Sequence, residues 1–426
     1  MNLTALLKDL ENCPCGRKHS FDVKRVEIAS GVTSKAGEIL ESESFGKRLL
    51  MVADANTYSA SNGLEASLEK SGFSVKKLIY PDLRVASEEG IAEVLALSND
   101  IDAIISVGTG SLNDICRVAS FRAKKKFCIF ATAPSMDGFA SNSAPIISGK
   151  FKESLFVAPP SVIIADTRIL ANAPIELKAS GFGDMIAKIN ADFEWRLSNI
   201  LTGEHYCERI SSLSVGAAKK VISLADKVCE KSEETAGAIM EALVISGLAM
   251  ALENTSRPAS GAEHILSHYW ECYKLARDIP QEFHGKKVGV ATLLMTEIFR
   301  NAVDRYESVT ECPENPDWDD IYSKFPKETA KDIERLNFPS VTDKIVPGSI
   351  EKNWQKIREL AYEILPTKQE LIRTMRAAGA PTEIEDIGIS RDLLYEGLKY
   401  HPYMRHRITF TRILPLIGID ICDLLD

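Results

Sequence analysis

Long apolar runs are almost absent from this sequence. The most apolar segment, AIMEALVISGLAMALEN, contains Glu241 and is too short to span a bilayer. The N-terminus, MNLTALLKDLENCPCGRKH, carries acids and early polar residues where a signal peptide has a basic head and a long apolar core. We therefore expect no membrane span and no secretory leader.

An excess of positive charge is also missing. The chain has 51 lysines and arginines against 60 aspartates and glutamates, a formal net charge of −9. This balance does not provide the excess positive charge with which proteins bind nucleic acid or an anionic membrane. Because 45% of the residues are hydrophobic, we expect a globular protein in which any anionic ligand is held by local groups.

A disulfide framework is not indicated either. The nine cysteines, an odd number, are scattered through the chain, as in a cytoplasmic protein with reduced thiols. Cys13, Cys15 and His19 resemble part of a zinc knuckle, but no fourth ligand lies at a suitable spacing. We therefore predict a cytoplasmic protein in which this segment is a surface loop without a metal.

Short β-branched segments alternate with helical ones up to about residue 169. The expected strands are 24–29, 47–53, 75–80, 102–107, 127–131 and 161–165, with helices near 57–71, 87–98 and 111–123. This order predicts βαβ units in a doubly wound, mainly parallel, Rossmann-like sheet. Residues 144–157 interrupt the order as a hairpin that turns near Gly149.

Helical spacing replaces the strands after Pro174. The expected helices are 175–198, 204–230, 233–252, 261–277 and 284–306, with shorter ones towards the C-terminus. The segment 311–320, ECPENPDWDD, is predicted to be a solvated loop. Because 426 residues exceed one ordinary core, we predict an α/β domain over 1–170 and an all-α domain over 171–426.

A glycine turn follows one expected strand in DAIISVGTGSLND. Gly108 and Gly110 allow close approach of the backbone, and the N–H groups that open the next helix favour an anion such as pyrophosphate. The dinucleotide fingerprint GxGxxG is not present, because Ser111 and Asn113 occupy the later positions. Taken alone, the glycines are better explained as a structural strand end.

Polar side chains follow two other expected strands. Asp54 stands where an acidic residue can accept hydrogen bonds from an adenosine ribose, although an aspartate that caps a helix is at least as common. The loop TAPSMDGFASN collects polar side chains, namely Thr132, Ser135, Asp137, Ser141 and Asn142. Ligands bind at the carboxyl edge of such sheets, so three loops there indicate a nucleotide site.

Histidines are few, yet three of the seven lie between residues 264 and 284. In GAEHILSH, His264 and His268 are one helical turn apart on the same face, and Glu263 precedes them. Such a pair can bind a metal, contact a substrate or lie on a solvent-exposed surface. The spacing leaves all three open.

Several motifs together resemble a known family. GTGSLND, TAPSMDGFASN, SGFGDMIAK, SRPASGAEHILSH and EFHGKKVGV are similar to segments of the sn-glycerol-1-phosphate dehydrogenases, between about residues 24 and 306. These enzymes belong to a superfamily with the metal-dependent polyol dehydrogenases and dehydroquinate synthases. The resemblance implies a dehydroquinate synthase-like fold, a homodimer, and a metal- and substrate-binding role for the helical domain. One departure is Thr109, where many members have glycine.

The resemblance also implies roles for individual residues. A divalent ion, zinc, nickel or iron, would be held by Asp184, His264 and His284, and Asp137, His268 and Asp184 would contact the substrate. NAD or NADP would contact Asp54, Gly108, Thr109, Gly110, Ser111, Leu112, Thr132, Ala133, Pro134, Ser135 and Ser141. From spacing alone, Lys188 and Arg257 are the candidate cations for a substrate phosphate.

The implied reaction is reversible hydride transfer between dihydroxyacetone phosphate, a phosphorylated triose, and the nicotinamide cofactor, giving sn-glycerol 1-phosphate. Three alternatives remain open. The chain could oxidise an unphosphorylated polyol such as glycerol, or catalyse the elimination and cyclisation of a dehydroquinate synthase. It could also be a metabolite sensor without activity, although a sensor would not need the complete Asp–His–His set.

Overall fold

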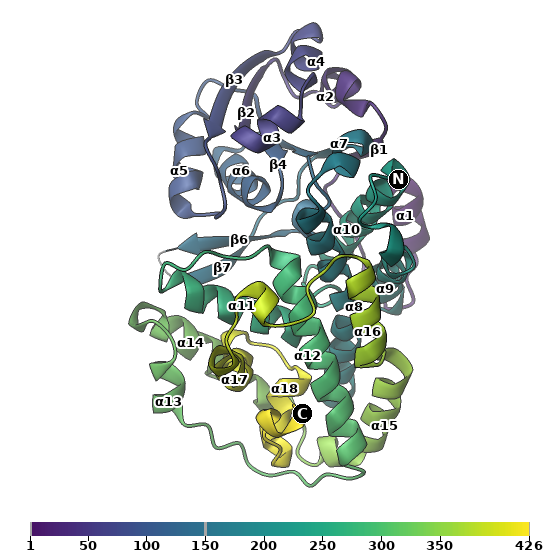
Figure 1. The fold of residues 1–426 in the computed structure, drawn as a ribbon, viewed down its shortest axis with the longest axis vertical. Helices are drawn as coiled ribbons and strands as arrows, with labels where there is room; N and C mark the ends of the chain where they lie inside the picture. The colour runs from purple at the N-terminus through teal and green to yellow at the C-terminus, as the bar shows by residue number, and fades with distance from the viewer. Residues whose placement is uncertain (1, 149–150, 426) are drawn as a thin grey trace.

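A six-stranded parallel sheet forms the upper half of the molecule (Figure 1). The computed structural model describes residues 2–148 and 151–425. The sheet has the order β1-β8-β5-β4-β2-β3. Its strands are β1 (Arg25–Ala29), β2 (Arg48–Asp54), β3 (Ser74–Tyr80), β4 (Ala103–Gly108), β5 (Lys126–Ala131) and β8 (Val162–Asp166). All six expected strands are present, and the doubly wound fold is confirmed.

The four inner strands β2, β4, β5 and β8 are buried on both faces of the sheet, which explains why they are nearly continuous apolar runs. Along β2, Leu50 and Val52 pack into one core, and Leu49 and Met51 into the other. The first face is covered by α5 (Glu88–Ala96) and α6 (Gly110–Ala123), the second by α2 (Ala36–Ser42) and α4 (Leu64–Lys70). The helix expected near 57–71 is split into α3 (Ala55–Ala60) and α4, because Gly63 has a φ of 92°.

The expected hairpin consists of β6 (Ser143–Ser148) and β7 (Phe151–Phe156), which pair antiparallel. Its turn at Gly149 lies outside the described residues. Figure 1 shows this hairpin between the main sheet and the helices of the lower half. Residues of β7 can therefore contribute to a site between the two halves.

The described chain after α7 (Thr167–Asn172) is mainly helical. The α-helices are α8 (Ile175–Thr202), α9 (Glu208–Ile222), α10 (Glu233–Glu253), α11 (Ala262–Leu275), α12 (His284–Arg305), α13 (Trp318–Ser323), α14 (Ala330–Asn337), α15 (Ser349–Ile364), α16 (Lys368–Ala377), α17 (Arg391–Tyr400) and α18 (Phe410–Ile413). The last strand ends at Asp166, close to the expected boundary at 170. The predicted loop over 311–320 is irregular as far as Asp317, which caps α13.

Helix α10 packs against both halves of the molecule. Ala236, Met240 and Val244, on one face, belong to the core of the sheet, whereas Ile239 and Leu243 belong to a helical core. Helix α10 has 21 residues, one more than the expected helix over 233–252. By length and composition alone it could span a membrane. However, 78% of its apolar window is buried in the protein, as in the core helix of a soluble protein.

The N-terminal segment joins the helical half. Helix α1 (Leu3–Leu10) ends at Leu10, which shares a core with Trp195, Ile210 and Leu252. The adjoining loop was predicted to lie on the surface, and for two of its side chains this is wrong. Cys13 and His19 are buried, because the loop folds against α9 and the end of α10. The expected domain 1–170 therefore includes a segment that packs with the second half.

Candidate active site

Three side chains expected to bind a metal meet in one place. Ligand atoms of Asp184, His264 and His284 all lie within 4.8 Å of one another. They come from the middle of α8, the start of α11 and the first residue of α12. Glycines bring α8 and α12 together, since a Cβ on Gly183 would lie 2.2 Å from the carbonyl oxygen of Gly285. This close approach places Asp184 beside His284.

The hydrogen bonds of this cluster fit a divalent ion. The Glu263 carboxylate, 2.7 Å from Nδ1 of His264, accepts the proton of that nitrogen and leaves Nε2 facing Asp184 at 3.4 Å. Nδ1 of His284 is buried and has no hydrogen-bond partner among residues 2–148 and 151–425. Burial lowers the pKa of His284 to about 3, so the ring is neutral and has a lone pair for a metal. One carboxylate and two imidazoles leave coordination positions open, as a catalytic site requires.

Lys188 and Asp137 extend the cluster towards the sheet. Nζ of Lys188 lies 2.7 Å from Asp184 and 2.8 Å from Asp137, and Ser246 donates to the same Asp137 oxygen at 2.9 Å. Burial and the Asp184 carboxylate raise the pKa of Asp137. Burial alone would lower the pKa of Lys188, but the two carboxylates outweigh it and raise that pKa. The lysine therefore holds two buried carboxylates together.

His268 lies beside the predicted metal ligands His264 and His284, as expected. Its ring centroid is 5.9 Å from that of His284 and 6.5 Å from that of His264. Nη2 of Arg405 lies 3.3 Å from Nδ1 of His268, and a guanidinium can only donate. Burial lowers the pKa of His268 well below its ordinary value, so the neutral ring keeps its proton on Nε2. The half-buried ring thus presents an N–H donor.

Three cations and one carboxylate lie near His268. Nζ of Lys152, from β7, lies 2.7 Å from Glu271, and Nζ of Lys287 lies 2.6 Å from the other oxygen of that residue. With Arg405, the group carries three positive charges and one negative charge, and we call these four residues the cation group. Burial lowers the pKa of both Lys287 and Arg405, so an added anion would stabilise them. Sequence reasoning missed this group, although Lys287 follows His284 in HGKK.

The two cations chosen from sequence spacing are placed differently. Arg257 is buried and pairs with Glu204, with its Nη2 2.5 Å and its Nε 2.8 Å from the two carboxylate oxygens. It also donates to Ser198 and to the carbonyl oxygen of Ile408. Lys188 is neutralised by Asp137 and Asp184. Both side chains are thus already paired with carboxylates, and their assignment to a phosphate stays a prediction that these contacts do not support.

The carboxyl ends of β2 and β4, where a nucleotide site is predicted, lie next to each other. The two strands are neighbours in the sheet, and the chain order reverses there, since β3 lies on the other side of β2. The alternative that Asp54 caps a helix is confirmed, because its Oδ1 accepts from the backbone N–H of Thr57 at 2.8 Å. Its role at a ribose stays a prediction. Gly108 ends β4, and Leu112 lies so close that a Cβ on this glycine would be 2.4 Å from Cδ1.

Thr109 is compatible with this turn because its φ is −126°, which needs no glycine. Gly110 is the first residue of α6, and Ser111 donates to the carbonyl oxygen of Arg84 at 3.0 Å. The next loop lies beside the turn, because the backbone N–H of Thr132 donates to the carbonyl oxygen of Gly108 at 3.1 Å. These residues are brought together as expected.

The 132–141 loop links the sheet to α8, the helix that carries Asp184. Ser180, on α8, donates to the carbonyl oxygen of Ser135 at 2.9 Å, and Pro134 is so close to α8 that a Cβ on Gly181 would lie 2.0 Å from its carbonyl oxygen. Ala133 is buried next to them. Ser141 is 1% exposed and donates to carbonyl oxygens within its own loop, so it supports the loop. The buried Arg117, which the sequence did not reveal, donates to Ser141 as well.

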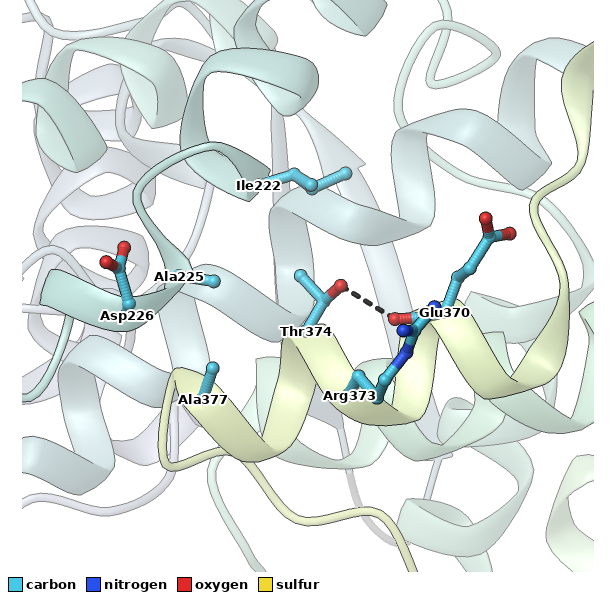
Figure 2. Close-up of a pocket in the computed structure, with 7 residues that line it drawn as sticks. All are labelled: Ile222, Ala225, Asp226, Glu370, Arg373, Thr374 and Ala377. Carbon is cyan, nitrogen blue, oxygen red and sulfur yellow. Dashed lines mark hydrogen bonds between the residues drawn. The ribbon is translucent and has the colours of Figure 1, made fainter.

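A surface pocket elsewhere contains none of the expected site residues. Figure 2 shows it between η3 (Ala225–Lys227) and α16, with Thr374 donating to the carbonyl oxygen of Glu370 at 2.7 Å. Arg373 and Asp226 line this pocket, whereas Asp184, His264 and His284 do not. The candidate active site is therefore the region between the sheet edge and α8, α11 and α12.

Comparisons with known proteins agree with this arrangement. A family model described as iron-containing alcohol dehydrogenase matches residues 27–174. Among solved structures, a probable glycerol dehydrogenase from Sinorhizobium meliloti has a TM-score of 0.62 at 17% identity, covering 95% of this chain and 96% of its own. An iron-containing alcohol dehydrogenase from Thermotoga maritima has a TM-score of 0.62 at 13% identity, covering 94% and 98%. These likenesses show the fold.

Curated relatives are more similar in sequence. Glycerol-1-phosphate dehydrogenase (NAD(P)+) of Halalkalibacterium halodurans is 30% identical over 404 residues, covering 93% of this chain and 94% of the relative. The protein of the same name from Bacillus subtilis is 31% identical over 374 residues, covering 86% and 85%. A relative of that name from Thermococcus sibiricus is 34% identical over 279 residues, covering 65% and 78%. The chain therefore belongs to the glycerol-1-phosphate dehydrogenase family.

Proposed function

We propose that the protein catalyses the reversible reduction of dihydroxyacetone phosphate to sn-glycerol 1-phosphate, with NAD(P)H as hydride donor and one proton taken up. The observation that carries this proposal is the position of the cation group next to His268 and the Asp184–His264–His284 cluster. Such an arrangement matches a small substrate with an oxygen to be polarised at one end and a phosphate at the other. We further propose a cytoplasmic homodimer.

A divalent ion held by Asp184, His264 and His284 would supply Lewis-acid polarisation of the substrate carbonyl. Zinc, nickel and iron all accept this donor set. The chain itself provides the orientation. Lys188 keeps Asp184 and Asp137 in place, and Glu263 fixes the tautomer of His264.

His268 is the residue of the chain best placed to bind a substrate oxygen. Because Arg405 donates to Nδ1, the proton of the neutral ring is on Nε2, from which it can donate to that oxygen. The low pKa of His268 means that the ring does not carry a positive charge at neutral pH. We assign it the orientation of the substrate, with the relay of a proton as a secondary role.

The phosphate would lie against Lys152, Lys287 and Arg405. These side chains carry two positive charges beyond the charge of Glu271, which matches a phosphate dianion. Charge-assisted hydrogen bonds of this kind are worth about 1.5–3 kcal/mol each. The substrate therefore belongs to the phosphorylated trioses in this proposal.

The decisive experiment supplies the metal-loaded protein with NADH and dihydroxyacetone phosphate and determines the stereochemistry of the product. We expect NADH to be consumed and sn-glycerol 1-phosphate to accumulate. A kcat/KM for glycerol comparable to that for glycerol 1-phosphate would instead identify a polyol dehydrogenase. Turnover of a sugar phosphate without net change in NADH would indicate a dehydroquinate synthase, and binding without turnover would indicate a sensor.

The His268→Ala variant should keep its metal and lose kcat/KM by about 10- to 100-fold, the equivalent of one lost hydrogen bond of about 1.5–3 kcal/mol. His268→Gln, which retains an N–H donor, should recover part of the loss. Steady-state kinetics combined with elemental analysis measure both quantities. If His268→Ala loses the metal as completely as His264→Ala, the two histidines have been assigned the wrong roles.

The Asp54→Ser variant tests the cofactor edge. Serine keeps the helix cap but removes the charge, so the structural role of Asp54 is retained. If the carboxylate faces the ribose, kcat/KM with NADP relative to NAD should rise about tenfold, equivalent to about 1.4 kcal/mol. Thr57→Ala is the matched control, since it disturbs the same cap and keeps the charge. An unchanged ratio in Asp54→Ser would make Asp54 a capping residue only.

A further inference from the structure

Four metal-binding side chains outside the active site converge near the N-terminus. Cys13, Cys15 and His19 come from the loop after α1, and Cys207 is the N-cap residue of α9. Their ligand atoms all lie within 4.8 Å of one another. Sulfur to sulfur, Cys13 and Cys207 are 3.5 Å apart although 194 residues separate them. Nε2 of His19 lies 3.1 Å from the sulfur of Cys15 and 3.6 Å from that of Cys207.

Two of these distances, 3.5 Å and 3.6 Å, match the edges of a tetrahedron around zinc, and the 3.1 Å between Cys15 and His19 is shorter. With Zn–S near 2.3 Å and Zn–N near 2.0–2.1 Å, neighbouring ligand atoms lie roughly 3.5–3.8 Å apart. A disulfide needs sulfurs about 2.05 Å apart, and the nine cysteines are all free. The arrangement therefore fits a shared ion rather than a bridge between Cys13 and Cys207.

The surroundings orient the ligands for a metal. Nδ1 of His19 lies 3.1 Å from the carbonyl oxygen of Leu252, which can only accept, so Nδ1 carries the proton and Nε2 offers its lone pair to the cysteines. The backbone N–H of Arg17 donates to the sulfur of Cys15 at 3.4 Å, which favours a thiolate. Gly16, with a φ of 79°, closes the turn by donating to the carbonyl oxygen of Cys13 at 3.1 Å.

We propose that Cys13, Cys15, His19 and Cys207 form a structural zinc site, separate from the catalytic metal. Three thiolates and one imidazole are soft donors that select zinc, and four protein ligands leave no position for a substrate. The site joins the N-terminal loop to the start of α9 and, through His19, to the end of α10. Because the ligands are so far apart in sequence, the ion would close a very long loop and stabilise the folded chain.

This site has a spectroscopic signature that the catalytic cluster lacks. The catalytic ligands contain no sulfur, so thiolate-to-metal charge transfer in the cobalt-substituted protein reports on the cysteine site alone. We expect the full-length protein to hold about two metal equivalents per chain and the cobalt form to show this band. Cys15→Ser should lose the band and about one equivalent, whereas His264→Ala should keep the band and lose the other. Cys229→Ser, at an exposed free cysteine, is the control and should change neither.

Three results would overturn the proposal. The first is a wild-type cobalt protein without thiolate charge transfer, a measurement that depends on no variant. The second is a Cys13–Cys207 disulfide detected by mass spectrometry of the protein purified without reductant. The third is full metal content in a folded Cys15→Ser variant. If Cys15→Ser does not fold, sulfur ligands seen by X-ray absorption of the zinc-loaded wild type decide the question.

Discussion

The His264→Ala and His284→Ala variants should each lose the catalytic metal and at least about a thousandfold in kcat, because Lewis-acid polarisation is worth several kcal/mol. Each substitution leaves only two of the three ligands that now lie within 4.8 Å of one another. Elemental analysis and kinetics on the same preparation measure both effects. Neither variant should unfold, since the histidines face a polar site and their helices are held by large apolar cores.

His406→Ala is the matched control for these variants. His406 is exposed and bonds to the carbonyl oxygen of Leu336, away from the three clustered rings. Its removal should leave metal content and kcat unchanged. A double His264→Ala/His284→Ala variant that retains its full metal content would refute the assignment of the catalytic ligands.

A Lys287→Met/Arg405→Ala double variant should lose kcat/KM for dihydroxyacetone phosphate by about a hundredfold or more, since two contacts of about 1.5–3 kcal/mol each are removed. Activity with glycerol should change little, because an unphosphorylated substrate does not use these charges. The ratio of the two kcat/KM values is therefore the quantity to compare between wild type and variant.

Lys286→Ala controls for the loss of a charge from the same helical turn. Lys286 pairs with Glu282 at 3.1 Å, and the cation group does not include it. Its replacement should leave the preference for the phosphate ester intact. An equal loss with glycerol in the double variant would show that Lys287 and Arg405 maintain the shape of the site and do not recognise a phosphate.

Much of the α/β half could be predicted from sequence because strands buried on both faces appear as uninterrupted apolar runs. The run at 47–53 became β2 with a shift of one residue at each end. The helix expected near 57–71 was wrong in one respect, because apolar spacing continues across Gly63 and does not show its positive φ. Local patterns therefore predicted the elements better than the breaks between them.

The metal ligands were predicted from the family resemblance, and the structure brings these three side chains together, although their role stays a prediction. The two phosphate cations were predicted from spacing alone, and both pair with carboxylates. Lys188, one turn after Asp184, was chosen because it shares a helix face with that residue, and this same geometry directs its ammonium to the carboxylate. Two members of the cation group, Lys152 and Arg405, come from a hairpin and from a loop near the C-terminus. Only the folded chain brings such distant residues to His268.

The cysteine site illustrates the same limit. Cys13, Cys15 and His19 have the spacing of half of a zinc site, and no fourth ligand lies near them in the sequence. Cys207 completes the set from the start of α9. Spacing rules for metal sites apply to ligands within one short segment. They cannot identify a ligand such as Cys207, which is almost 200 residues from Cys13.

The packing of α10 also means that the two halves should not survive separation. A fragment that ends near residue 170 would lack the helix whose side chains complete the core on one face of the sheet, namely Ala236, Met240, Val244 and Leu248. A fragment that begins there would expose the same side chains to water. The boundary suggested by the order of strands and helices therefore does not separate two independently folding domains. We expect the whole chain to denature in a single cooperative transition.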